Sequence, residues 1–112
     1  MRTVEMRGPA DVVFLRLVRS ATFALAATAG LSLDDSEELA LAADEACNLL
    51  VAADAGELKV TFVYEGRVAI TIEATSRLSV KVDTVSELIL TSMTDTVTID
   101  PNGVILLEKE AT

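Results

Sequence analysis

The chain has 112 residues, a length that suits one globular domain with a single core, so we expect residues 1–112 to form one domain. Hydrophobic residues make up 51% of the chain and charged residues only 24%, which excludes a disordered acidic tail. Nine Lys and Arg stand against eighteen Asp and Glu. The resulting charge of -9 repels polyanions, so we expect no direct nucleic-acid partner.

Several residue types that carry enzyme chemistry are missing. The chain has no His and one cysteine, Cys47, which excludes an internal disulfide, Cys/His zinc sites and Ser/His/Asp triads. We therefore expect no metal site. The apolar run from Val12 to Leu31 is interrupted by Arg16 and Arg19, so it predicts neither a signal peptide nor a membrane span. These features favour a cytoplasmic protein that contacts no membrane.

The first 30 residues predict a strand followed by a helix. Residues 3–7 are compatible with a strand, and Gly8-Pro9 suggests that a helix begins with Pro at its first position. Residues 10–29 favour helix, and Gly30 offers a stop. Helical spacing predicts a broad apolar face made of Val13, Phe14, Leu17, Val18, Ala21 and Leu25.

A second helix is predicted from the Ser32 cap to about Ala53. Ser32 and Asp35 match a capping box, and the acids through Glu38 complement the helix dipole. Both sides of this helix are largely apolar, so we expect it to be covered on both. Cys47 lies toward its buried side and is expected to be a small apolar filler, because no adjacent cation would lower its pKa.

Beyond Gly56 the hydrophobic period changes to two. Residues 58–63 and 68–73 alternate around the Glu65-Gly66 turn, which predicts an antiparallel hairpin with one buried face. Residues 74–82 show no clear pattern. A third capping pattern over residues 84–87 predicts a short helix. A second hairpin is predicted from residues 96–99 and 104–109 around the turn Asp100-Pro101-Asn102-Gly103.

This order of elements predicts an α+β fold. We expect a two-layer sandwich in which helices cover one face of a mostly antiparallel, mixed sheet. The other face of the sheet would be open to solvent or to a partner.

The segment LALAADEACNLLV, residues 39–51, carries the most informative polar residues. On a helix, Glu45 and Asn48 lie within about 60° of each other. A carboxylate and an amide beside a sheet are suited to holding a water or a hydrated metal. The alternative is that both belong to a solvated stripe, which the spacing alone favours.

The order of elements, with LALAADEACNLLV on the second helix and ITIEA ending the first hairpin, resembles the anti-sigma factor and serine-kinase branch of the GHKL ATPases over nearly the whole chain. In that family a Glu-x-x-x-Asn motif supplies the base that activates the nucleophile and a magnesium ligand. Glu45 matches the base, which implies a catalytic role only if kinase activity is retained. Leu49 occupies the Asn position, and Asn48, one residue early, is the candidate cofactor ligand.

The other nucleotide motifs of that family are degenerate here. An Asp-x-Gly-x-Gly run is replaced by EATSRL, which places Ala74 where the adenine-binding Asp would be. No Gly occurs between Gly66 and Gly103, so the glycine-rich ATP lid is missing or shortened. Because adenine and phosphates would lose hydrogen-bond partners, we expect no cofactor, neither ATP nor Mg.

The resemblance also indicates a protein-binding surface. Arg19 precedes Glu45 by 26 residues, a spacing similar to that of a family arginine that contacts the sigma factor and, competitively, its antagonist. Val12, Arg16, Arg19 and Phe23 follow a 4-3-4 helical spacing, and an Arg beside an exposed aromatic is typical of an interaction hot spot. The alternative is that Phe23 covers a neighbouring helix end while the arginines pair with surface acids.

Three functional hypotheses follow from the sequence. The first is an anti-sigma-factor-like regulator that binds a sigma factor or an anti-anti-sigma protein through Arg16, Arg19 and Phe23, without phosphotransfer. The second is an ATP-dependent protein serine kinase of the same family that phosphorylates an anti-anti-sigma partner with Glu45 as base. The third is a self-associating module that forms a homodimer through the open sheet face.

Overall fold

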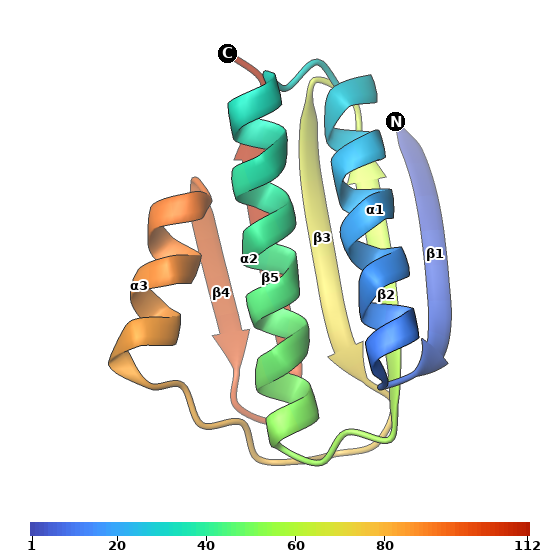
Figure 1. Ribbon diagram of the computed structural model, residues 1–112, viewed down its shortest axis with the longest axis vertical. Helices are drawn as coiled ribbons and strands as arrows, with labels where there is room; N and C mark the ends of the chain where they lie inside the picture. Colours follow the sequence, from blue (N-terminus) through green and yellow to red (C-terminus); the bar gives the residue numbers. More distant parts are fainter.

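A five-stranded sheet and three helices make up residues 1–112, all of which are described in a computed structural model (Figure 1). In chain order the elements are β1 (Arg2–Pro9), α1 (Val12–Thr28), α2 (Leu33–Ala52), β2 (Glu57–Tyr64), β3 (Arg67–Ala74), α3 (Thr84–Met93), β4 (Thr96–Asp100) and β5 (Val104–Glu110). The strand order is β1-β2-β3-β5-β4.

Every neighbouring strand pair in the sheet is antiparallel. The predicted α+β architecture is therefore confirmed, but the expectation of a mixed sheet is wrong. The reason is that two helices, not one, connect β1 to β2, so the chain returns to the end of the sheet at which β1 finished (Figure 1).

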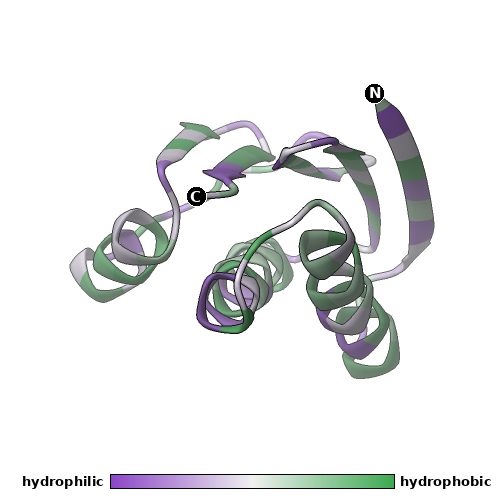
Figure 2. Ribbon diagram, turned by 90° about the horizontal axis from the view of Figure 1, so that it is seen from above, coloured by the Kyte–Doolittle hydropathy of each residue, from purple (hydrophilic) through white to green (hydrophobic).

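The helices cover one face of the sheet and leave the other face open (Figure 2). Alternation along the strands sends one set of side chains under the helices, as the period of two predicted. These side chains have no exposed surface in the three central strands: Leu58, Val60, Phe62, Val68, Ile70, Ile72, Ile105 and Leu107. They form the floor of the core on which the helices rest.

Helix α1 begins one turn later than the sequence suggested. Asp11 caps it, with its carboxylate accepting a hydrogen bond from Phe14 N at 2.9 Å. Pro9 is not the first helical residue, because β1 continues through Pro9, which lies opposite Glu57 on β2. The predicted stop is confirmed, since Gly30 follows the helix with a φ of 96°.

The buried face of α1 is narrower than predicted. Its fully buried residues are Phe14, Val18, Thr22 and Ala26, an i, i+4 series that faces the sheet and α2. Val13 and Leu17, which were expected in the core, are 61% and 54% exposed. A single helix lying on a sheet beside one neighbour buries only part of its circumference, so half of this apolar face stays in solvent.

Helix α2 lies at the centre of the helical layer, between α1 and α3 (Figure 1). Ser32 caps it by accepting a hydrogen bond from Asp35 N at 3.1 Å, as predicted. The expectation that both of its sides are covered is confirmed by its buried residues: Ser36, Leu39, Ala40, Ala42, Ala43, Ala46, Cys47, Leu49 and Leu50. Four of the nine are alanines, and these allow the flanking elements to approach closely.

The segment between β3 and α3 forms no helix or strand after Ala74. Its backbone is tied to the β4–β5 turn, because Leu78 N and Val80 N donate hydrogen bonds to the carbonyls of Asn102 and Pro101. Helix α3 then begins at Thr84, and its cap is Asp83, one residue before the predicted capping pattern.

One buried charge joins three elements at the edge of the core. Lys109 follows Ile105 and Leu107 on the inner face of β5 and is only 7% exposed. Its ammonium donates a hydrogen bond to the Met93 carbonyl at the end of α3, at 2.9 Å. The carboxylates of Asp35 and Glu38 lie 3.8 and 4.0 Å away in the first turns of α2. A cation at the end of α3 and acids at the start of α2 each complement a helix dipole, so Lys109 stabilises both helices against β5.

A substitution at Gly8 tests the packing of α1 on β1. A Cβ at this position would lie 2.5 Å from Cδ1 of Phe14, so the buried ring would have to move. We expect Gly8→Ala to lower the free energy of unfolding by about 1–3 kcal/mol, measured by urea denaturation. Gly56→Ala is the matched control, because a Cβ there meets no atom within 4 Å. Equal stability of the two variants would contradict this account.

Candidate functional site

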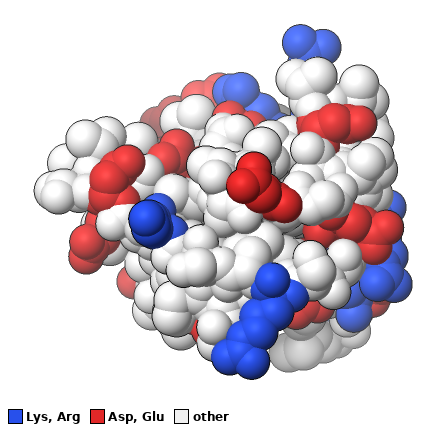
Figure 3. Space-filling model, turned by 90° about the horizontal axis from the view of Figure 1, so that it is seen from below, with Lys and Arg blue, Asp and Glu red and all other residues white.

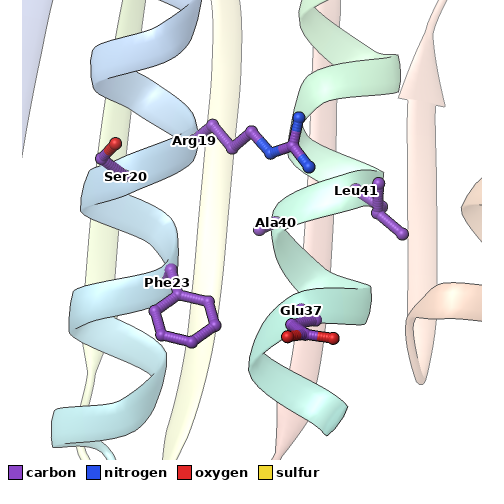
Figure 4. A pocket seen from close by; sticks show the side chains of 6 residues that line it. All are labelled: Arg19, Ser20, Phe23, Glu37, Ala40 and Leu41. Carbon is purple, nitrogen blue, oxygen red and sulfur yellow. The ribbon is translucent and has the colours of Figure 1, made fainter. Parts of the chain in front are cut away.

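A hollow of about 600 Å³ opens between α1 and α2 on the side of the helices away from the sheet (Figure 4). Its lining comes from one turn and a half of each helix: Arg19, Ser20 and Phe23 from α1, and Glu37, Ala40 and Leu41 from α2. The side chain of Arg19 reaches across toward α2, and the ring of Phe23 points toward Glu37 (Figure 4). The small residues Ser20 and Ala40 leave the space between these larger side chains.

The structure thus brings together two of the three predicted partner-binding residues, Arg19 and Phe23. Phe23 is half-buried rather than exposed, since its ring lies in the groove between the two helices. Arg16 is exposed and lies outside the lining of the hollow, about one helical turn before Arg19. Glu37 and Leu41 were missed by the sequence analysis, although their spacing of four places both on one side of a helix.

The arginines of α1 are free of ion pairs. Neither Arg16 nor Arg19 has an acidic group within 4.0 Å, although Glu37 lines the same hollow as Arg19. The alternative in which these arginines pair with surface acids is therefore wrong. Since α1 contains no acid, its only two charges are positive and available to an external group.

Glu45 lies in a different place, on the side of α2 that faces α3. Its Oε1 accepts a hydrogen bond from Ser86 Oγ at 2.6 Å, and Ser86 is almost fully buried. Ser86 N in turn donates to Asp83 Oδ1 at 2.7 Å. This bond, together with a contribution from the Ser86 hydroxyl, lowers the pKa of the Asp83 carboxyl below its usual value. Glu45 is thus a half-buried acceptor that connects α2 to the first turn of α3.

Asn48 lies on the exposed surface of α2, and its side chain makes no hydrogen bond within the protein. Glu45 and Asn48 therefore do not share a common partner. The solvated-stripe alternative describes Asn48 but not Glu45, whose partner Ser86 is distant in sequence.

Cys47 is fully buried, as predicted. Burial raises the pKa of its thiol to about 12, with the negative charge of Asp44 as a smaller cause. At neutral pH the group is a thiol and packs as an apolar side chain.

Charged groups elsewhere on the molecule are dispersed. Figure 3 views the end at which α2 finishes and shows Lys and Arg scattered among Asp and Glu, with uncharged surface between them. No group of three or more Cys, Asp and Glu side chains is arranged to hold a metal ion. No helix combines the length and the apolar character that crossing a bilayer requires.

Comparison with known proteins identifies the fold but not a sequence family. No model of a known protein family matches the chain, and no curated protein matches it. Among solved structures, the crystal structure of the RsbU and RsbW domains of Rv1364c from Mycobacterium tuberculosis is similar, with a TM-score of 0.71 and 13% identity. The similarity covers 98% of this chain and 32% of that one, so the chain spans about a third of its length.

This similarity shows the fold alone. The architecture of five antiparallel strands covered on one face by three helices is the α+β sandwich of the GHKL type, as the sequence resemblance implied. No glycine-rich lid follows β3, because residues 75–83 are a short connection held against the β4–β5 turn.

The contact between Glu45 and Ser86 can be tested by hydrogen exchange. Ser86→Ala removes the donor and leaves a half-buried carboxylate with no partner, so we expect a loss of about 1 kcal/mol in stability. The backbone amides of α3 should exchange faster than those of α1. Ser92→Ala is the control, because Ser92 is an exposed residue of the same helix whose hydroxyl makes no hydrogen bond. Unchanged exchange in α3 of the Ser86 variant would show that the contact does not hold the helix.

Proposed function

We propose that the protein is an anti-sigma-factor-like regulator. It binds a sigma factor or an anti-anti-sigma protein in the cytoplasm through the outer surface of α1 and the hollow between α1 and α2. It acts by occupying its partner, without ATP-dependent phosphotransfer.

The observation that carries this proposal is the unpaired Arg19 beside the half-buried Phe23 at the hollow. An arginine that no internal acid neutralises, next to an aromatic ring in a concave site, is the residue pair that dominates many protein interfaces. A hollow of about 600 Å³ is large enough to receive one or two side chains of a partner.

The distribution of charge specifies the chemistry of the partner surface. The first 30 residues contain four arginines and two acids, whereas the remaining residues contain five Lys and Arg against sixteen acids. Helix α1 is thus the basic part of an acidic protein. A partner with carboxylates around an apolar side chain complements Arg16, Arg19 and the hollow, and it is repelled by the rest of the surface.

Three features support a function without nucleotide chemistry. Glu45, the residue at the position of the family base, accepts a hydrogen bond from Ser86. Helix α3 packs directly on α2 at this level, with Leu90 fully buried between them and the sheet. Ala74 ends β3 with a methyl group, which accepts no hydrogen bond from an adenine amine.

Reversal of the charge at Arg19 tests the binding surface. The protein would be co-expressed and co-purified with each sigma factor and each anti-anti-sigma protein encoded in its own genome. We expect Arg19→Glu to weaken the complex about tenfold or more, because a carboxylate partner is then repelled. Arg77→Glu is the matched control, since Arg77 is also exposed and unpaired but lies on the segment after β3. Equal losses in both variants would indicate general electrostatics and contradict a site on α1.

Calorimetric titration with ATP and Mg tests the absence of nucleotide chemistry. We expect no saturable heat up to about 1 mM nucleotide, which corresponds to a binding free energy weaker than about 4 kcal/mol. Micromolar binding would overturn this part of the proposal, and partner phosphorylation that Glu45→Ala abolishes would favour a kinase. The Arg19→Glu complex measured without nucleotide separates the two questions.

A further inference from the structure

Strand β1 is an open edge of the sheet along its whole length. It pairs with β2 on one side only, and no other element lies beyond it (Figures 1 and 2). The opposite edge differs, because β4 has five residues against eight in β1 and α3 lies beside it. The outward backbone N–H and C=O groups of β1 are therefore available to another strand.

The side of α1 that faces this edge is apolar and uncharged. Arg19 points toward α2, and at about 100° per residue Leu17, Ala21 and Ala24 lie about 140–160° around the helix from it. Leu17 is 54% exposed, and the alanines add small apolar surface beside it. Below them, Val4 and Met6 on the helix-facing side of β1 are only half-buried, since no further strand covers them.

Backbone and side chains at this flank fit the same kind of occupant. An added strand would place alternate side chains on the helix side, against Val4, Met6 and Leu17, and those side chains would have to be apolar. Its backbone would satisfy the open groups of β1. An amphipathic helix docked here would cover the apolar surface but leave the backbone groups of the edge unpaired.

Charge distinguishes a partner segment from a second copy of the chain. Arg2 and Arg7 lie near the two ends of β1, and Arg2 has no acidic group within 4.0 Å. Two copies paired through β1 would bring two net-positive N-terminal regions together. A segment with a carboxylate near each end would instead meet an arginine at each end of β1.

We propose that the β1–α1 flank, formed by β1 and by Leu17, Ala21 and Ala24 of α1, binds an extended segment of a partner protein as a sixth strand. The segment alternates apolar with polar residues and carries acidic residues at its ends. The flank lies on the opposite side of α1 from the hollow, so this inference stands independently of the proposed function.

A synthetic heptapeptide tests the proposal. The probe alternates polar residues with valine, carries Glu at both ends, and is acetylated and amidated. In an NMR titration of the full chain we expect amide shift changes and slowed exchange confined to β1 and to residues near Leu17. A peptide with Lys at both ends should bind about tenfold more weakly, because it meets Arg2 and Arg7.

Backbone pairing is tested with two N-methylated forms of the same peptide. Alternate N–H groups of a strand point to opposite edges, so methylating one alternate set removes the bonds to β1 and methylating the other does not. We expect one form to lose binding and the other to retain it. Equal affinity of both forms would exclude strand addition.

The helical part of the flank is tested with Leu17→Glu. This change places a carboxylate against the valines of the probe, and we expect about a tenfold loss of affinity. Leu88→Glu is the matched control, because Leu88 is similarly exposed, at 64%, but lies on α3. No binding to the folded chain, equal effects of the two variants, or a dimer that protects β1 in the absence of peptide would each overturn the proposal.

Discussion

The burial of α2 against the sheet, with α1 on one side and α3 on the other, is the constraint on which the rest of the structure depends. Its buried surface is built largely from alanines, so the neighbouring helices approach closely and side chains at their borders meet at fixed places. The border with α1 contains the hollow, because Ser20 and Ala40 are small. The border with α3 contains the Glu45–Ser86 hydrogen bond. The two sites are thus two sides of one helix.

The position of Glu45 shows how one residue serves different chemistry on one fold. A carboxylate that activates a nucleophile needs an open space in front of it and a substrate within hydrogen-bond reach. Here the donor in front of Glu45 is the hydroxyl of Ser86 on α3, and the adjacent space contains Leu90. The carboxylate therefore contributes to the packing of a helix. Loss of the glycine-rich segment after β3 is consistent with this role, since a short connection places α3 directly against α2.

The separation of charge along the chain gives the molecule a direction. Helix α1 has two arginines and no acid, while acids outnumber bases by more than three to one after residue 30. An acidic partner is thereby attracted to one helix and its two flanks. On one flank lies the hollow with Arg19 and Phe23, and on the other lie the open edge of β1 and Leu17. The strong overall negative charge opposes association through most other surfaces.

Local sequence determined the elements of this protein, because caps, turns and periodicity act over a few residues. Ser32, Gly30 and the Glu65-Gly66 turn were readable, since each satisfies or bends the backbone beside it. The buried faces of β2, β3 and β5 were readable as well, because an alternation of two has only one apolar side. Tertiary structure alone decided how much of α1 is covered, that Ser86 meets Glu45, and that Lys109 is buried beneath two helices. These contacts join residues that are 16 to 74 positions apart, such as Lys109 with Met93 and with Asp35. Spacing along a chain carries no information about such distances, because they are set by which helix packs beside which strand.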